Sequence, residues 1–194
     1  MFKPQLKLTK AAVQELADGY MAGLSDRDKA LEEAVMSRFH ARKGRIQRLS
    51  LDELRLIGEW KTPRSKPLIA GNDADFVEEA TAVAFAKSSG CRLRIEVLTL
   101  LRGVCWPTAS VILHLCHASE YPILDISALA ALGISSPGTG PRRGFCRLTR
   151  YHFDFWRDYT AFARQQCARL SVDMRTLDRA LWQRGSELTA KRQR

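Results

Sequence analysis

The stretch LLRGVCWPTASVIL, residues 100–113, decides the fold that we expect. It reads as the end of an apolar helix, a turn centred on Gly103, and a second apolar helix that begins with small residues. Gly103 allows main-chain conformations that are closed to other residues, and Pro107 suits the first turn of a helix, where its missing N–H costs nothing. We therefore predict a helix-hairpin-helix over residues 92–118. The alternative is an ordinary corner between two helices, in which Gly103 and Pro107 only turn the chain.

This turn would suit a phosphate group. The first amide N–H groups of a helix have no partner within the helix, and they lie at the positive end of its dipole. An anion can bind there without any reading of the base sequence. We expect the turn to contact DNA through five residues, which are Arg102, Gly103, Val104, Cys105 and Thr108.

The rest of the chain shows the apolar period of helices nearly throughout. No run alternates for long enough to form a sheet, so we predict an all-α fold, either one compact unit over residues 1–194 or two helical lobes that share a core. Ser25 should cap one helix, Ser50 and Glu53 should form a capping box before another, and Pro63 should end it. Further helices are expected from Asn72, from Asp125 to Leu132, over about 147–170 and over 174–183, with a clear loop at residues 133–146 and a frayed C-terminal tail.

The charge of the chain favours a polyanion as partner. Lys and Arg number 31 against 21 Asp and Glu, which gives a net charge of +10 and a pI near 9.7. Such a field attracts nucleic acid first and an anionic membrane surface second. No apolar run approaches the roughly 20 residues of a membrane span, and the N-terminus lacks the apolar segment of a secretory signal. We expect double-stranded DNA as the partner, no membrane, a monomer, and a cytoplasmic location (nucleoid-associated if the protein is bacterial).

The remaining candidate residues are basic side chains and possible metal ligands. The five cysteines are scattered without metal-ligand spacing, so we expect reduced, mostly buried thiols, no metal and no cofactor. His114 and His117 could begin a zinc site, but no second ligand pair stands nearby. Trp60 is interpreted as a core residue, and the basic run of residues 38–48 as a solvated helix end. We expect further phosphate contacts from Lys61, Arg64 and Lys66 and from the loop residues Arg142 and Arg143.

The turn and the residues after it resemble the helix-hairpin-helix of the DNA glycosylase superfamily, which includes endonuclease III, the MutY-type enzymes and the alkyl-base glycosylases. In that family a hairpin of the form L-P-G-V-G-x-x-T-A precedes an apolar helix and then an Asp that opens the next helix. Here LRGVCWPTA is followed by YPILDISALAALG, residues 121–133, in which the Asp is Asp125. The offset from Pro107 (125 − 107 = 18) matches the family's spacing between its variable catalytic-lysine position and its Asp.

The resemblance covers about residues 50 to 135. Within it, Cys105 stands where the family has a second glycine, and Arg102 stands where the family often has proline. Outside it, the closing phrase MRTLDRALW, residues 174–182, is similar to a motif of uncharacterised bacterial proteins related to this fold.

The resemblance implies a base-excision activity. Enzymes of this family flip a damaged or mispaired base out of the duplex and cleave its N-glycosidic bond. A carboxylate near C1′ stabilises the sugar cation of the transition state, and the resemblance gives this role to Asp125. Strand cleavage would need a lysine nucleophile at the position of Pro107, so the expected enzyme is a monofunctional glycosylase with a multi-helix fold.

Three alternatives stay open at this point. Asp125 could act only as the N-cap of the helix that follows it. The protein could also be a DNA-binding module that keeps the fold without cleavage. In a third possibility the fold mediates contacts with other proteins, which a neutral hairpin surface would favour.

Overall fold

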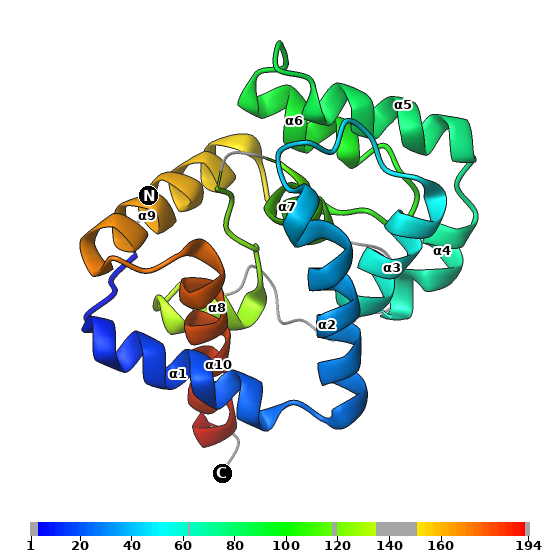
Figure 1. Ribbon diagram of the computed structural model, residues 1–194. Coiled ribbons are helices and arrows are strands. Elements are labelled where there is room, and N and C mark those ends of the chain that lie inside the picture. The colour runs from blue at the N-terminus through cyan, green and yellow to red at the C-terminus, as the bar shows by residue number, and fades with distance from the viewer. Residues whose placement is uncertain (1–3, 62, 118–119, 135–150, 193–194) are drawn as a thin grey trace. The chain divides into compact units, whose positions relative to one another are not determined.

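The computed structural model describes residues 4–61, 63–117, 120–134 and 151–192 (Figure 1). Every regular element within these ranges is a helix, which confirms the predicted all-α fold. The contacts divide the chain into two compact units. The first unit joins both ends of the sequence, Met1–Leu24 and Pro122–Arg194, and the second is the continuous segment Ser25–Tyr121.

The first unit is built around the C-terminal helix. Its helices are α1 (Lys10–Gly23), α8 (Ile126–Ala131), α9 (Phe153–Leu170) and α10 (Met174–Arg192). Helix α10 packs against both α8 and α1, so segments from opposite ends of the sequence lie side by side (Figure 1). The rings of Tyr20 in α1 and Trp182 in α10 meet edge to face, with centroids 5.2 Å apart. This contact helps to tie the N-terminal helix to the C-terminal one.

The second unit contains the described part of the segment over which a helix-hairpin-helix is predicted. Its elements are α2 (Asp26–Phe39), η1 (His40–Arg42), α3 (Leu51–Lys61), η2 (Pro63–Ser65), α4 (Lys66–Ala70), α5 (Ala74–Phe85), α6 (Cys91–Leu98) and α7 (Trp106–Cys116). Helix α7 is buried on all sides except near its start. Its few polar groups are satisfied locally, since Ser110 donates to the carbonyl of Pro107 at 2.7 Å and Nδ1 of His114 lies 2.7 Å from the carbonyl oxygen of Tyr121. Helix α7 is therefore the core of this unit.

The helix ends follow the local signals of the sequence. The Ser25 hydroxyl accepts from the amide of Asp28 at the start of α2. Ser50 and Glu53 form the predicted capping box, because each accepts from the main-chain N–H of the other, at 3.2 and 3.1 Å. Helix α3 ends at Lys61, as Pro63 requires.

Several boundaries differ from the prediction. Asp73, not Asn72, caps α5, because the side chain of Asn72 turns to other partners. Helix α9 begins at Phe153, not near residue 147, since His152 caps it and Tyr151 lies outside it. Helix α10 continues to Arg192, so the expected frayed tail is helical as far as that residue. The short helix α4 was not anticipated, and Cys91 is exposed although most thiols were expected to be buried.

No helix within the described residues combines the length and the apolar character that crossing a membrane would take.

Candidate nucleic-acid interface

The turn between α6 and α7 has the geometry that its glycine predicts. Gly103 adopts a left-handed conformation with φ of +79°. The amide of Val104 then donates to the carbonyl of Leu101 at 3.0 Å, which closes the turn. Cys105 is the N-cap residue of α7 with φ of −105° and ψ of 177°. The conformation of Cys105 is extended, so a cysteine fits this position without main-chain strain.

The five residues expected to contact DNA differ in what they can offer. Arg102 is exposed, whereas the residue of Val104 is only 5% exposed and that of Thr108 only 1%. Cys105 and Gly103 are half-buried. A buried side chain cannot reach a phosphate, so the side chains of Val104 and Thr108 would not contribute to a phosphate site. The amide of Val104 is already bonded to Leu101, and Arg102 would supply the positive charge.

The turn rests on α4, and the basic segment of residues 61–66 leads directly into that helix. A Cβ atom on Gly103 would lie 2.9 Å from Cγ1 of Ile69 and 3.0 Å from Cβ of Leu68. Gly103 therefore allows an approach to α4 that any side chain would block. This contact joins the turn to the part of the second unit that carries Lys61, Arg64 and Lys66.

The three basic residues of this segment differ in exposure and in partners. Lys61 is half-buried, and Arg64 is exposed with no acidic partner among the described residues. Lys66 forms an ion pair with Glu59 at 3.0 Å, and both side chains are accessible. An exposed pair of this kind is weak enough for a phosphate to replace the carboxylate. Trp60, interpreted as a core residue, is half-buried, and its Nε1 donates to Glu32 at 3.0 Å.

The basic run of residues 38–48 is largely neutralised by acidic side chains of its own unit. Arg38 and Arg42 both bind Oε1 of Glu53, at 3.0 and 2.6 Å. Burial raises the pKa of Glu53, but the hydrogen bonds from Arg42 and the Ser50 amide, with the charges of both arginines, outweigh it and hold the pKa below its ordinary value. Lys43 and Arg48 likewise pair with Glu120 and Glu78. Arg38 and Arg42, which share the buried Glu53, are therefore a poor choice for DNA contacts, whereas the pair of Arg48 and Glu78 is as accessible as that of Lys66 and Glu59.

Asp125 lies in the first unit, whereas the turn lies in the second. Its side chain is half-buried and accepts from the amide of Ser127 at 2.8 Å, so it is the N-cap of α8. Two residues earlier, the carbonyl of Ile123 accepts from the hydroxyl of Tyr159 at 3.1 Å. Burial raises the pKa of Tyr159, and the nearby charges of Asp178 and Asp125 raise it further. Tyr159 therefore stays neutral and holds the segment before Asp125 in place.

Two histidines and the cations near the start of α9 already have partners. Nδ1 of His114 bonds to a carbonyl, and Nε2 of His117 lies 2.6 Å from a guanidinium nitrogen of Arg94. No group of three potential metal ligands occurs among the described residues.

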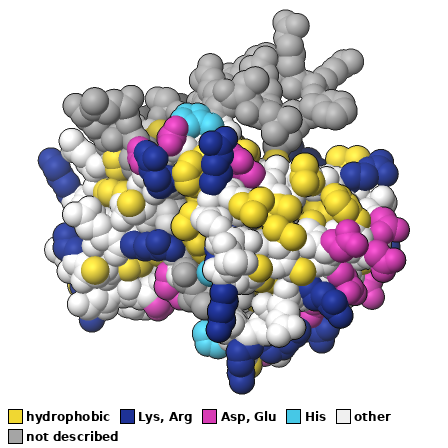
Figure 2. Space-filling view, turned by 90° about the horizontal axis from the view of Figure 1, so that it is seen from above, with side chains coloured by type: hydrophobic (Ala, Val, Ile, Leu, Met, Phe, Trp, Pro, Cys, Tyr) yellow, Lys and Arg dark blue, Asp and Glu magenta, His cyan; other side chains and the backbone are white. Residues whose placement is uncertain are grey.

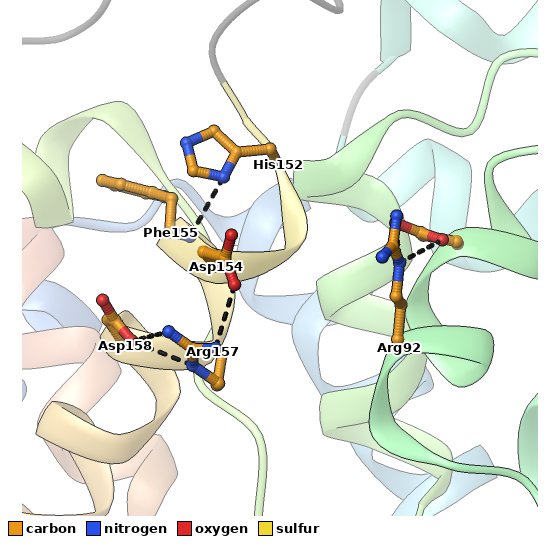
Figure 3. A network of polar contacts seen from close by, with 7 residues as sticks. Arg92, His152, Asp154, Phe155, Arg157 and Asp158 are labelled. Atoms are coloured by element: carbon orange, nitrogen blue, oxygen red, sulfur yellow. Dashed lines mark hydrogen bonds and ion pairs between the residues drawn. The ribbon is translucent and has the colours of Figure 1, made fainter.

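Figure 3 shows Arg157 bonded to Asp154 and Asp158, and a separate ion pair between Arg92 and Glu96 in α6. Arg142 and Arg143 lie outside the described residues.

An apolar surface marks another part of the second unit. Figure 2, which looks down on α5 and α6, shows hydrophobic side chains gathered on that side with acidic side chains beside them. Among the described residues, the large exposed apolar side chains of α5 and α6 are Phe76, Val83 and Leu93, whereas the exposed Leu68 and Leu100 lie in α4 and in the turn itself. Acidic residues repel phosphate, so this surface is not where we expect DNA to bind.

Sequence reasoning missed one residue that contacts the turn. Asn72 was interpreted as a helix start because it precedes the apolar pattern of α5, but its amide group binds the main chain of Arg102. A signal was present, since Asp73 directly after it is an equally good N-cap residue and leaves Asn72 available for another role.

Comparisons of the chain with models of protein families, with curated proteins and with solved structures found no match.

Proposed function

We propose that this protein binds double-stranded DNA through the turn of residues 99–105 and acts on it as a monofunctional DNA glycosylase. The observation that carries the proposal is the left-handed Gly103 directly before the N-terminus of α7. The N-terminus of a helix is a position where main-chain N–H groups can bind an anion, and the exposed Arg102 lies in the turn that leads to it. A phosphate of the DNA backbone is the anion that the net charge of +10 also favours.

The proposed chemistry is hydrolysis of an N-glycosidic bond. Asp125 would stabilise the positive charge that develops on the sugar as the base leaves, and could orient the attacking water. Pro107 offers no amine for a Schiff base, so the reaction would stop at the abasic site. This part of the proposal rests on the spacing between the hairpin and Asp125 that resembles the glycosylase superfamily.

A second candidate is a DNA-binding protein without cleavage. The bond between Asp125 and the Ser127 amide favours it, because an N-cap role is a sufficient reason for an aspartate at this position. Both candidates predict DNA binding that weakens steeply with salt, and they differ only in whether a base is released.

The test uses duplex oligonucleotides that each carry one lesion or mismatch, incubated with wild type and with Asp125→Asn. Asparagine caps helices about as well as aspartate, so this variant keeps α8 folded and removes only the charge. We expect wild type to produce an alkali-sensitive site on at least one duplex, and the variant to be slower by about a hundredfold or more.

Three results would each contradict a different part of this proposal. Salt-dependent binding without base release from any duplex would support the non-cleaving candidate. Equal rates for wild type and Asp125→Asn would remove Asp125 from the chemistry. Absence of salt-dependent DNA binding by wild type would overturn both candidates.

A further inference from the structure

Asn72 binds the turn at both main-chain groups of one residue. Its Oδ1 accepts from the amide of Arg102 at 2.7 Å, and its Nδ2 donates to the carbonyl of the same residue at 2.9 Å. Nδ2 also donates to the carbonyl of Ile69 in α4 at 2.9 Å. The residue is only 8% exposed, so these bonds form away from solvent. A single amide side chain thus connects α4 to the turn.

The partners determine how this amide is oriented. The N–H of Arg102 takes an acceptor and its carbonyl takes a donor, while the carbonyl of Ile69 accepts from the side chain of Asn72 in addition to the main-chain N–H of the same residue at 3.2 Å. A planar amide side chain carries one acceptor oxygen and an NH2 group with two protons, so it can bond to all three of these main-chain groups at once. Aspartate has the same shape but no donor, and alanine has neither group. Of these three side chains, only asparagine bonds to both main-chain groups of Arg102.

The contact leaves little freedom at the turn. Arg102 is held by Asn72, and its guanidinium donates to the carbonyl of Gly71 at 3.2 Å. The next residue, Gly103, is pressed against Ile69 and Leu68 in α4. Arg102, which precedes the proposed phosphate site, is thus fixed by bonds within the protein, and no ligand is needed to order its main chain.

We propose that Asn72 is the positioning residue of this turn: it holds the main chain of Arg102 and Gly103 in one conformation, so that a phosphate group meets a preformed site. The choice of phosphate as the ligand rests on the proposed function, whereas the role of Asn72 in fixing the turn does not. A preformed site loses less conformational entropy when it binds a ligand, so loss of the hydrogen bonds between Asn72 and Arg102 should appear as weaker DNA binding.

The test compares Asn72→Ala and Asn72→Asp with a control in the same unit. Thr81→Ala is the control, because Thr81 is fully buried in α5 and its hydrogen bonds are with Leu49, Val77 and Glu78, none of which lies in the turn. Each variant is measured well below its own melting temperature. The readouts are the hydrogen-exchange rate of the Arg102 amide and the Kd for a labelled DNA duplex at several salt concentrations.

We expect Asn72→Ala to speed exchange at the Arg102 amide by about tenfold or more relative to wild type, because that amide loses its acceptor. Asn72→Asp keeps the acceptor and should protect the amide better than alanine does. We expect Kd to rise by about tenfold in Asn72→Ala. The slope of log Kd against log salt should stay unchanged, since no charge is removed, whereas Arg102→Gln should reduce it by about one.

Two outcomes would overturn the proposal. One is an Arg102 amide that exchanges in Asn72→Ala as slowly as in wild type. The other is a loss of DNA affinity in Thr81→Ala equal to that in Asn72→Ala, which would mean that general destabilisation explains the effect. If wild type binds no duplex, the proposed function fails, and the exchange measurement still decides the role of Asn72.

Discussion

At the scale of single residues, close approach between main chains explains why two positions are glycine. Gly103 faces α4, as described above, and Gly185 faces α8 within the first unit. A Cβ atom on Gly185 would lie 1.8 Å from the carbonyl oxygen of Ser127. A main-chain atom cannot move aside as a flexible side chain can, so α10 and α8 would have to separate.

We expect Gly185→Ala to destabilise the protein by roughly 3 kcal/mol or more, as overpacking against a rigid main chain does. Gly23→Ala is the matched control, because a Cβ at Gly23 in α1 would meet no atom within 4 Å. Alanine suits a helix better than glycine, so the control should be neutral or stabilising by up to about 1 kcal/mol. Urea unfolding of both variants measures the difference, and equal stabilities would show that α10 and α8 do not approach this closely.

At the scale of elements, buried hydrogen bonds and ion pairs at the helix ends contribute more to the stability of the fold than exposed surface ion pairs do. The start of α3 is an example, since Glu53 closes the capping box and also binds Arg38 and Arg42 from the preceding helices. Its side chain is only 7% exposed, whereas both arginines are about half exposed. One carboxylate therefore joins α2, η1 and α3.

The lowered pKa of Glu53 predicts how stability depends on pH. A carboxyl group with a lower pKa in the folded state contributes stability above its unfolded pKa, near 4.5, and loses it as the pH falls through the folded value. Glu53→Gln keeps a capping-box side chain but not the charge. We therefore expect this variant to be less stable than wild type near neutral pH, and the difference to shrink as the pH falls well below 4.5.

Thermal unfolding across this range provides the measurement, with Glu59→Gln as the control. The pair between Glu59 and Lys66 is solvent-accessible, so its loss should cost less than about 1 kcal/mol at any pH. A difference between wild type and Glu53→Gln that stays constant with pH would contradict a charge-dependent role for Glu53.

At the scale of the whole molecule, the two units differ in how the sequence builds them. The second unit is one continuous segment, Ser25–Tyr121, with its own buried core around α7. The first unit needs α1 from one end of the sequence to cover α10 at the other. Long-range closure of this kind carries an entropic cost that a continuous segment avoids.

We expect the fragment of residues 25–121 to fold by itself as a helical domain with a cooperative thermal transition. Removal of residues 1–24 from the full chain should instead destabilise the first unit, because Val13 and Ala17 no longer bury apolar surface against it. Hydrogen exchange should then show lost protection in α10 and retained protection in α7. Loss of protection in α7 as well would mean that the units do not fold independently.

The fold and the candidate site differ in how far sequence could predict them. The caps at Ser25 and Ser50 and the end of α3 before Pro63 depend on neighbouring residues, and the sequence predicted them correctly, whereas it missed α4 and the starts of α5 and α9. The turn at Gly103 follows from the same local rules. The proposed roles of the turn and of Asp125 in DNA binding and base excision stay predictions.

The amino-acid sequence by itself determined which segments are helical and where the chain must turn, because those choices are made within a few residues by capping groups, proline geometry and apolar spacing. Only the tertiary structure decided that Asn72 binds the turn, that Glu53 pairs with Arg38 and Arg42 and that α1 covers α10. Each of these depends on groups distant in sequence that come within bonding distance only when the chain has folded, and no local pattern records such a distance.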